Sequence, residues 1–515
     1  MDKQIDAAAA ACRIEDGDTV LITGSGGGLM DADHVFAGIE ERFLSDGHPR
    51  DLTLIHATGI GTREHTGLSR FAHEGLVRRV IGGHWAWSPE MIGLALDDKI
   101  EAYNLPQGVL SLLTREVAAG RSGLLTPVGL QTFVDPRQTG GKLNARTTDD
   151  LVERVTVGGE EKLFYRSLPI DVTILRGTTA DENGNISVER EAATLDVLSA
   201  AQAAYNSGGT VIAQVQRIAQ GQTLHPRDVQ VPAPLVDAVV EHPAQRQTVE
   251  SAYNPSFSGE LRTPLTAIDP LPFGLRKIIA RRAAQELRTG AIVNLGFGIA
   301  DGVANVAAET GQIDEITFSV EQGIVGGVPA KGDVFGAGYN PEAIVDATHQ
   351  FDFYHGGGLD LTFLGMAQID RHGNVNVSKF GRQLPGCGGF IDISQNTPEV
   401  IFCGTFTAGG LDIEVEDGQL AIRQEGTINK FVEDVEHITF SGPYSREHNQ
   451  RVLYVTERAV FHLTDDGLEL IEVAPGIDWE ADVLDRMAFT PAVSPSLDTM
   501  DAHIFQPDRI ETPTN

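Results

Sequence analysis

Glu321 is the residue of this chain whose position is best suited to chemistry. It follows the apolar run Ile316–Phe318, which predicts a short buried strand, and glycines and a proline come after it. A carboxylate at the end of a strand, on a turn without bulky neighbours, is placed to meet a substrate. A free glutamate has a pKa of about 4.3, so it is an oxygen nucleophile at neutral pH. A solvated surface charge is the alternative, because the chain has 72 acidic residues.

A glycine turn over Gly386–Gly389 offers what such a nucleophile requires. Attack on a carbonyl creates an oxyanion, and backbone amides on a glycine turn donate to it with no side chain in the way. Gly388 and Gly389 are the candidate donors, and a plain turn between strands is the alternative. Cys387 has no evident histidine base nearby, so we expect a small buried thiol there.

An earlier glycine turn, Gly24–Gly28, stands after a predicted strand. It lacks the Gly-x-Gly-x-x-Gly spacing and the Lys-Ser/Thr ending of a P-loop. The pattern therefore favours a strand-to-helix turn. A phosphate cradle, with Gly26, Gly27 and Gly28 as cofactor-binding residues, is the alternative.

Three other polar residues have structural interpretations. His355 lies in a glycine loop and could carry protons, but an exposed loop histidine is the commoner case. Asp181 and Asp370 occupy matched positions in two similar turns, so we expect both to stabilise turns rather than to catalyse.

The elements that position these residues occur twice along the chain. Residues 17–28 predict a strand and a glycine turn, followed by a helix, and residues 290–299 predict the same. This is the opening of a βαβ unit. Two further stretches match in the same order, and the second pair predicts hairpins: 53–60 with 317–324, and 181–188 with 370–377. We therefore expect two related α/β units in tandem.

The two copies of the repeat differ at the position of Glu321, because the matching residue in the first copy is Ala57. A single carboxylate in a pseudo-symmetric pair indicates an active site between the halves. The first copy is about 75 residues longer between matched glycines, which predicts an insertion around 66–165. Residues 243–264 lack periodicity and predict a linker. The predicted domains are thus 1–264 and 265–515.

Composition excludes several classes of function. The 515 residues carry a net charge of -33, which argues against nucleic acid as a partner. Three cysteines without ligand spacing predict neither a disulfide framework nor a metal site. No apolar stretch is long enough for a membrane span, and the acidic start is unlike a signal peptide, so we expect a cytoplasmic protein.

The run Ser-x-Glu-x-Gly around Glu321, followed by Gly-Gly-x-Pro, resembles the catalytic signature of the family I coenzyme A transferases. The likeness to the single-chain propionate/acetate CoA-transferases runs from about residue 15 to 506. The segments that carry it are 124–129, 132–137, 176–178 with 180–185, 351–354, 356–361, 403–410 and 474–478. Gln322 stands at a position that varies in the family. His355 stands where close relatives usually have an acidic residue.

The resemblance implies a transferase that moves coenzyme A between short-chain acids such as propionate and acetate. It implies two halves, α-like and β-like, each an open α/β domain. It also implies a homo-oligomer, with a tetramer favoured and a dimer possible. Glu321 falls on the glutamyl-CoA thioester position, and Gly386–Gly389 falls on the glycine motif near the reacting carbonyl. Coenzyme A is then a substrate and part of a covalent intermediate, with no tightly bound cofactor.

Two other functions compete with this one. A thioesterase on the same fold would let water attack the same intermediate. A non-catalytic regulator that binds acyl-CoA or a sugar phosphate would use a related α/β fold. The acidic charge and the absence of a DNA-binding segment argue against the regulator.

Overall fold

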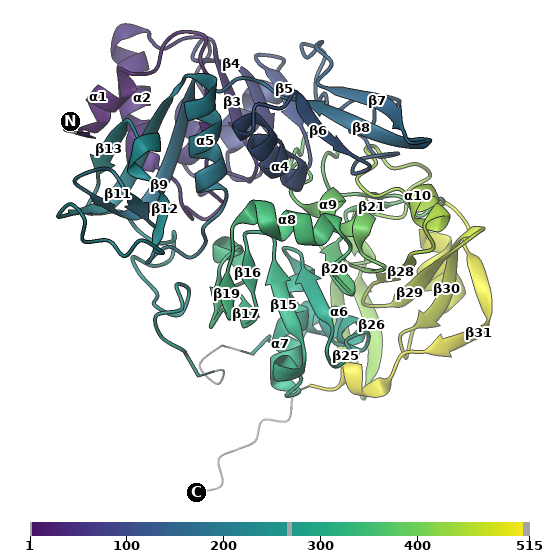
Figure 1. Cartoon of the computed structure of the whole chain (residues 1–515). Helices are drawn as coiled ribbons and strands as arrows, with labels where there is room; N and C mark the ends of the chain where they lie inside the picture. The colour runs from purple at the N-terminus through teal and green to yellow at the C-terminus, as the bar shows by residue number, and fades with distance from the viewer. Residues whose placement is uncertain (1–2, 265–269, 508–515) are drawn as a thin grey trace, which may run out of the picture. The chain divides into compact units, whose positions relative to one another are not determined.

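The computed structural model describes residues 3–264 and 270–507, and the chain in it forms two units (Figure 1). The first unit contains residues 1–263, 319–356 and 378–396, and the second contains 264–318, 357–377 and 397–515. The division after Thr263 lies next to the predicted boundary, which borders residues 265–269, outside the described part. The predicted domain 265–515 differs from the structure, because two of its segments pack into the first unit.

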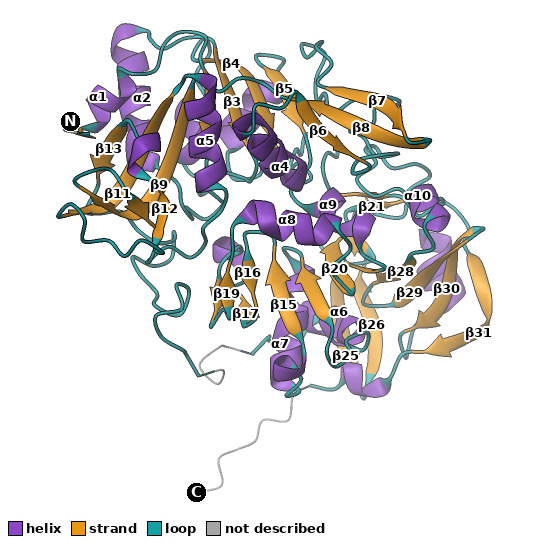
Figure 2. Cartoon of the chain, in the orientation of Figure 1, coloured by secondary structure: helices purple, strands orange, loops and turns teal. Residues whose placement is uncertain are grey.

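The first unit is built on a parallel sheet with helices on both faces (Figure 2). All neighbours along its main path, β1-β13-β11-β9-β2-β3-β4-β5, run parallel. The strands in this order are Gln4–Ile5, Ala238–Glu241, Thr210–Ala219, Val172–Asp181, Thr19–Ile22, Leu52–His56, Val77–Gly82 and Glu101–Asn104. The helices of the N-terminal segment are α1 (Ala7–Ala11), α2 (Asp33–Asp46), α3 (Pro89–Leu96), α4 (Gln107–Ala118) and α5 (Val197–Ser207).

Smaller elements complete the N-terminal segment. Short strands β10 (Ile186–Ser187) and β12 (Val229–Val231) join the large sheet antiparallel. The predicted insertion holds a separate antiparallel sheet of β6 (Gly123–Thr126), β8 (Glu160–Arg166) and β7 (Val152–Val157). The predicted linker 243–264, which lies within the described residues, contains no helix or strand. It nevertheless packs within the first unit, where Phe257 is buried in a hydrophobic cluster.

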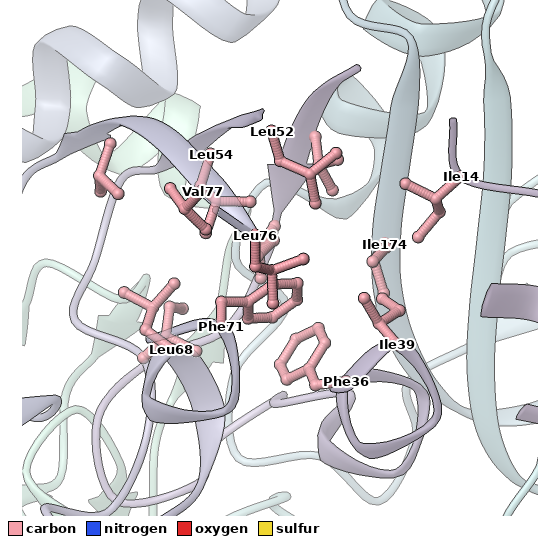
Figure 3. Packing of buried hydrophobic residues seen from close by; sticks show 14 of the residues in the cluster. Ile14, Phe36, Ile39, Leu52, Leu54, Leu68, Phe71, Leu76, Val77 and Ile174 are labelled. Carbon is pink, nitrogen blue, oxygen red and sulfur yellow. The ribbon is translucent and has the colours of Figure 1, made fainter. Parts of the chain in front are cut away.

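Alternation along the strands fills both faces of the sheet. On one face, Leu54 and Ile174 pack with α2 residues Phe36 and Ile39 and with Phe71, forming the cluster shown in Figure 3. The rings of Phe36 and Phe71 meet edge to face, with centroids 5.4 Å apart. Leu21, Ile55 and Ile81 point to the other face, toward Leu110 and Leu113 of α4.

The helix predicted through Val35, Ile39 and Phe43 is α2, and its sequence explains both its burial and its end. Val35 and Ile39 are fully buried one turn apart, while Phe43 is partly buried. The helix stops at Gly47, whose φ of 74° is the left-handed conformation that glycine adopts at helix C-termini.

The two segments that return to the first unit carry the remaining elements of interest. Residues 319–356 hold the end of β15 (Thr317–Val320), β16 (Ile324–Val325), β17 (Val328–Pro329), β18 (Gly338–Tyr339), β19 (Ala343–Ile344) and α8 (Ala347–His355). Residues 378–396 hold a glycine turn and α9 (Phe390–Asn396). Hydrogen bonds from Gly108 and Val109 to Asp392 fix α9 against α4, which is why this segment does not fold with the rest of the C-terminal half.

The second unit repeats the strand–turn–helix opening with β14 (Ile292–Leu295) and α7 (Gly302–Glu309). Its strand order is β14-β20-β23-β28-β29-β30-β31. From β20 onward these strands are Leu361–Gly365, Glu399–Cys403, Arg451–Val455, Ala459–Thr464, Gly467–Val473 and Ala492–Thr499. The other elements are α6 (Leu275–Ala284), α10 (Gly442–Glu447) and the short strands β21 (Gln368–Ile369), β22 (Val375–Asn376), β24 (Thr407–Ala408), β25 (Asp412–Glu416), β26 (Gln419–Gln424) and β27 (Ile428–Asn429).

The repeated turns have the same internal geometry. The Asp181 carboxylate accepts from the amides of Asn183 and Asn185, at 3.0 and 2.9 Å. The Asp370 carboxylate accepts from those of His372 and Asn374, at 2.9 and 3.1 Å. Each turn closes an antiparallel pair, β9 with β10 and β21 with β22. The predicted hairpins and the structural role of both aspartates are confirmed.

None of the described helices combines the length and the apolar composition needed to cross a membrane.

Candidate active site in the first unit

Glu321 stands at the tip of a tight hairpin between β15 and β16. Val320 pairs with Ile324, so only three residues make the turn, and the Gly323 amide donates to the Val320 carbonyl at 3.0 Å. Gly323 has a φ of 100°, and a Cβ on it would lie 2.0 Å from the Val345 carbonyl oxygen. Only glycine fits this position, so the turn holds the partly buried Glu321 at a fixed place.

The glycine turn before α9 lies directly against Glu321. A Cβ built on Gly389 would stand 3.5 Å from Cγ and 3.6 Å from Cβ of Glu321. The structure therefore brings together Glu321 and Gly389 of the glycine turn, which are 68 positions apart in the sequence.

Hydrogen bonds from the N-terminal segment hold the glycine turn. The Cys387 amide donates to Oδ1 of Asn104 at 2.9 Å, and the Gly388 amide donates to the Gly83 carbonyl at 2.8 Å. The Gln107 amide donates to the Gly388 carbonyl at 2.9 Å. The same Asn104 side chain donates to the carbonyl of Gly83, the residue after β4, so Asn104 links the end of β4 to the glycine turn.

The engaged Gly388 amide corrects the predicted pair of oxyanion donors. Because its N–H already points at the Gly83 oxygen, it has no second hydrogen to offer a substrate. Within the described residues, no acceptor takes the Gly389 amide. Of the two predicted donors, Gly389 is thus the one whose amide is not engaged within the described residues, and the Gly388 amide helps to fix the shape of the turn.

Two residues next to the turn carried no motif in the sequence. A Cβ on Gly388 would lie 3.8 Å from Oε1 of Gln107 and 3.5 Å from Cδ2 of His84. Gln107 is the first residue of α4, and its side-chain amide is buried. In the described part of the chain, no partner accepts a hydrogen bond from its Nε2. Burial lowers the pKa of His84 to about 4, so its imidazole is neutral near pH 7.

A hydrogen bond links the earlier glycine turn to the residue that follows Glu321. Gln322, the residue after Glu321, donates from Nε2 to Oγ of Ser25 at 3.4 Å. Within the turn, the Gly27 amide donates to the Gly61 carbonyl at 3.1 Å, and a Cβ on Gly26 would lie 2.0 Å from Nε1 of Trp87. These glycines are thus used for close packing, and the Gly27 N–H is not directed at a ligand.

The thiol in the glycine turn is buried and inert. Cys387 is 4% exposed. Burial raises the pKa of its thiol well above the usual value, and the negative charge of Asp392 adds to the effect. A thiol that stays protonated is not a nucleophile at neutral pH, which agrees with the prediction of a buried structural cysteine.

The interpretation of His355 as an exposed loop histidine is wrong. It is the last residue of α8, its side chain is 13% exposed, and its Nε2 lies 2.8 Å from Oδ1 of Asp392. The glycines that follow suggested a loop, but the helix extends to His355 because Tyr354 and Phe351 are buried on its inner side.

No group of three or more histidine, cysteine or carboxylate side chains in the described part of the chain is arranged to hold a metal ion.

Comparison with known proteins identifies the family. The coenzyme A transferase family model matches residues 4–242. Acetate CoA-transferase YdiF of Escherichia coli K12 is 46% identical over 502 residues, covering 97% of this chain and 94% of its own. Caffeate CoA-transferase of Acetobacterium woodii is 48% identical over 513 residues, covering 98% of both chains.

Solved structures agree over the whole length. The apoenzyme of the acyl-CoA transferase YdiF from E. coli O157:H7 superposes with a TM-score of 0.94 at 44% identity, covering 98% of this chain and 96% of that one. The same protein as a thioester complex with CoA gives a TM-score of 0.93. The chain is therefore a single-chain member of the family I coenzyme A transferases, and its activity is the transfer of coenzyme A between acyl groups.

Proposed function

We propose that the chain transfers coenzyme A between short-chain carboxylic acids, such as propionate and acetate, and that Glu321 is the nucleophile. The observation that carries the proposal is the position of Glu321 at a three-residue hairpin tip, with Cγ 3.5 Å from the Cβ position of Gly389. A carboxylate and a backbone amide at one place are the two groups that acyl transfer through an anhydride needs.

The reaction begins on the thioester. A carboxylate oxygen of Glu321 attacks the acyl carbonyl, the C–S bond breaks, and coenzyme A leaves as a thiolate. The product is an acyl-glutamyl anhydride. The thiolate then attacks the glutamyl carbonyl and releases the first acid as a carboxylate, which leaves a glutamyl-CoA thioester. A second acid reverses the two steps and leaves as the new acyl-CoA, so the kinetics are ping-pong.

Each attack creates a tetrahedral oxyanion, and two groups of the site support its stabilisation. The Gly389 amide and Nε2 of Gln107 are donors without an acceptor in the described part of the chain, and both belong to residues at the glycine turn. Removing one oxyanion donor costs roughly a hundredfold to a thousandfold in kcat in well-studied hydrolases. We expect a loss of this order for the change of Gln107 to Ala.

We assign the turn Gly26–Gly28 to one wall of the coenzyme A site. The contact between Ser25 and Gln322 supports this, because it sets the turn beside the nucleophile loop. The Gly27 amide, which is bonded to the Gly61 carbonyl, is not among the groups that could bind a phosphate there. Coenzyme A acts as a substrate and as part of the covalent intermediate, without any resident cofactor.

The acids and the assembly belong to the proposal as well. The relative named for acetate and the relative named for caffeate have nearly the same sequence identity to this chain, so identity does not choose between the two acids. We propose short-chain acids as the substrates. We also propose a cytoplasmic homo-oligomer, a tetramer rather than a dimer, without nucleic acid or membrane as a partner. A panel of acids in competition and light scattering on the purified protein test the two statements.

One assay separates the transferase from a thioesterase. The protein is incubated with propionyl-CoA, with and without acetate, and free thiol and acetyl-CoA are measured. The proposal predicts acetyl-CoA at a rate far above the release of free thiol. Continuous thiol release without acetate, at the rate seen with acetate, contradicts it and supports the thioesterase.

A further inference from the structure

Two consecutive residues at the end of α8 reach both sides of the site. Oη of Tyr354 donates to Oγ of Ser319 at 3.0 Å, two residues before Glu321. Nε2 of His355 lies 2.8 Å from Oδ1 of Asp392, three residues after Gly389. One helix end is thus fastened to the strand that presents the nucleophile and to the helix that follows the glycine turn.

Asp392 also caps α4. Its carboxylate accepts from the amides of Gly108 and Val109 at 3.0 and 3.1 Å, and the side chain is fully buried. A carboxylate at a helix N-terminus satisfies amides that have no partner within the helix and is favoured by the helix dipole. With His355, the buried carboxylate has three donors.

These contacts fix the position of Gln107. Its amide is bonded to the Gly388 carbonyl, and the next two amides are bonded to Asp392. A shift of Asp392 therefore moves the first turn of α4 and the glycine turn together. Both groups proposed to stabilise the oxyanion, Gln107 and Gly389, depend on it.

The packing leaves little freedom for such a shift. A Cβ on Gly108 would lie 2.3 Å from Cδ1 of Phe351 and 2.7 Å from Oδ1 of Asp392. The ring of His355 packs near Phe351, with centroids 6.3 Å apart. The first turn of α4 is thus enclosed by α8 and α9, and His355 closes the arrangement with a directed hydrogen bond.

We propose that His355 is a positioning residue. Its hydrogen bond to Asp392 holds Gln107 and Gly389 at the reacting end of Glu321, and it sets the rate of the chemical steps rather than the affinity for substrates. This inference rests on the proposed function, because it assigns the oxyanion donors to the residues that Asp392 holds.

Four variants separate positioning from general stability. His355→Gln retains an N–H group near the position of Nε2, whereas His355→Leu and the shorter His355→Asn do not bring one to Asp392. Asp352→Asn is the matched control. It weakens another link between α8 and α4, the partly exposed pair of Asp352 with Arg115, and it touches neither Asp392 nor Gln107.

The kinetic expectation follows from geometry. A misplacement of about 1 Å at reacting groups costs up to about a hundredfold in rate, so kcat of the Leu and Asn variants should fall by about ten- to a hundredfold. KM for propionyl-CoA should change by less than about threefold, because ground-state binding is retained. The Gln and Asp352 variants should stay within about threefold of wild type in both parameters.

Amide hydrogen exchange gives a readout that is independent of catalysis. Exchange in peptides that cover 107–109 and 386–393 should be faster in His355→Leu and His355→Asn, and unchanged in His355→Gln and Asp352→Asn. Unchanged exchange in the first two variants would overturn the proposal, whatever their activity.

Two kinetic results would overturn it as well: wild-type kcat in both loss variants, or a loss in His355→Gln equal to that in His355→Leu. Failure of the proposed function has a different signature. In that case the wild-type protein forms no coenzyme A adduct on Glu321, while the exchange measurement still decides whether His355 positions α4 and the glycine turn.

Discussion

Cγ of Glu321 lies 3.5 Å from the point where a Cβ on Gly389 would stand, an ordinary van der Waals distance. Gly389 therefore lies within contact distance of Glu321, and within the described residues no acceptor takes its amide. Gly388, one residue earlier, has the opposite character, because its amide is bonded to Gly83 and its φ is 52°.

Gly389→Ala should reduce activity more than stability. Its φ lies outside the left-handed region, and the nearest atom to the new methyl group is the side-chain end Cδ1 of Ile393 at 3.3 Å, so the chain accommodates the substitution. The methyl group then contacts Glu321 and restricts the movement of its side chain. We expect kcat to fall at least about tenfold, as for a misplaced reacting group. Steady-state kinetics and thermal denaturation of the same preparation measure the two effects.

Gly388→Ala is the matched control for that variant. No atom lies within 3.4 Å of the new methyl group, but the left-handed conformation costs a non-glycine residue about 1–2 kcal/mol. Stability should therefore fall, with activity per folded molecule reduced less than in Gly389→Ala. The reverse order of activities would contradict the division of roles between the two glycines.

Gly26→Ala should destabilise the protein. The new Cβ would lie 2.0 Å from Nε1 of Trp87, whose ring also has the guanidinium of Arg63 stacked 4.3 Å from its centroid. Overpacking of this kind costs about 1–3 kcal/mol. Gly93, in α3 with no neighbour within 4 Å, is the control, and Gly93→Ala should add about 0.5–1 kcal/mol of stability. Urea denaturation distinguishes the two signs.

Cys387→Ala should keep most of the activity. The pKa of the thiol is raised by burial, so the thiol is neither a nucleophile nor readily alkylated. We expect kcat within about threefold of wild type and iodoacetamide labelling confined to exposed Cys12 at pH 7.5. Loss of transfer in Cys387→Ala without loss of folding would show that the thiol has a chemical role.

Asp196 should make stability fall as pH rises. Burial, with a contribution from the charge of Asp346, raises the pKa of this carboxyl from 3.8 to about 7. Between these values the folded protein holds a proton that the unfolded chain has lost, so its stability decreases toward pH 7. The side chain introduced by Asp196→Asn does not titrate. Between pH 4 and pH 8, the free energy of unfolding of wild type should therefore fall by on the order of 3 kcal/mol more than that of the variant.

Urea denaturation at pH 5 and pH 8 checks the sign. Exposed Asp228 provides the control, and Asp228→Asn should follow the wild-type pH dependence. A wild-type protein whose midpoint changes with pH as little as that of Asp196→Asn would contradict the assignment.

The sequence predicted the elements that carry local signals. Glycine turns after apolar runs predicted the ends of β2 and β15, and the period of Val35 and Ile39 predicted α2. The asparagine-glycine turns in the matched stretches 181–188 and 370–377 predicted two hairpins. Because these features depend on neighbours within a few residues, their physical causes are present in the local sequence.

The contacts that complete the site join residues far apart in the sequence, and local sequence signals do not predict them. Asn104 bonds to Cys387, and Gly108 bonds to Asp392, across more than 280 positions. The amide of Gly388 was a candidate donor until the structure showed that Gly83 occupies it. Single asparagines, glycines and glutamines give no periodic signal, so Gln107 and the link from His355 to Asp392 are visible only in three dimensions.

Glu321→Ala should abolish exchange, since no other described carboxylate occupies the hairpin tip. We expect at least about a hundredfold loss of kcat, as expected when a covalent nucleophile is removed. Glu321→Gln preserves the shape of the side chain and is the control for folding. Retention of transfer in either variant would argue that another group attacks the thioester.

Mass spectrometry of the trapped enzyme tests the assignment of the nucleophile most directly. The protein is mixed with propionyl-CoA, quenched and digested, and the peptide that contains Glu321 is compared in wild type and Glu321→Gln. A label with the mass of coenzyme A on that peptide, present only in the wild type, is the predicted result. Exchange that proceeds with no label there, or a label on another residue, would contradict the account.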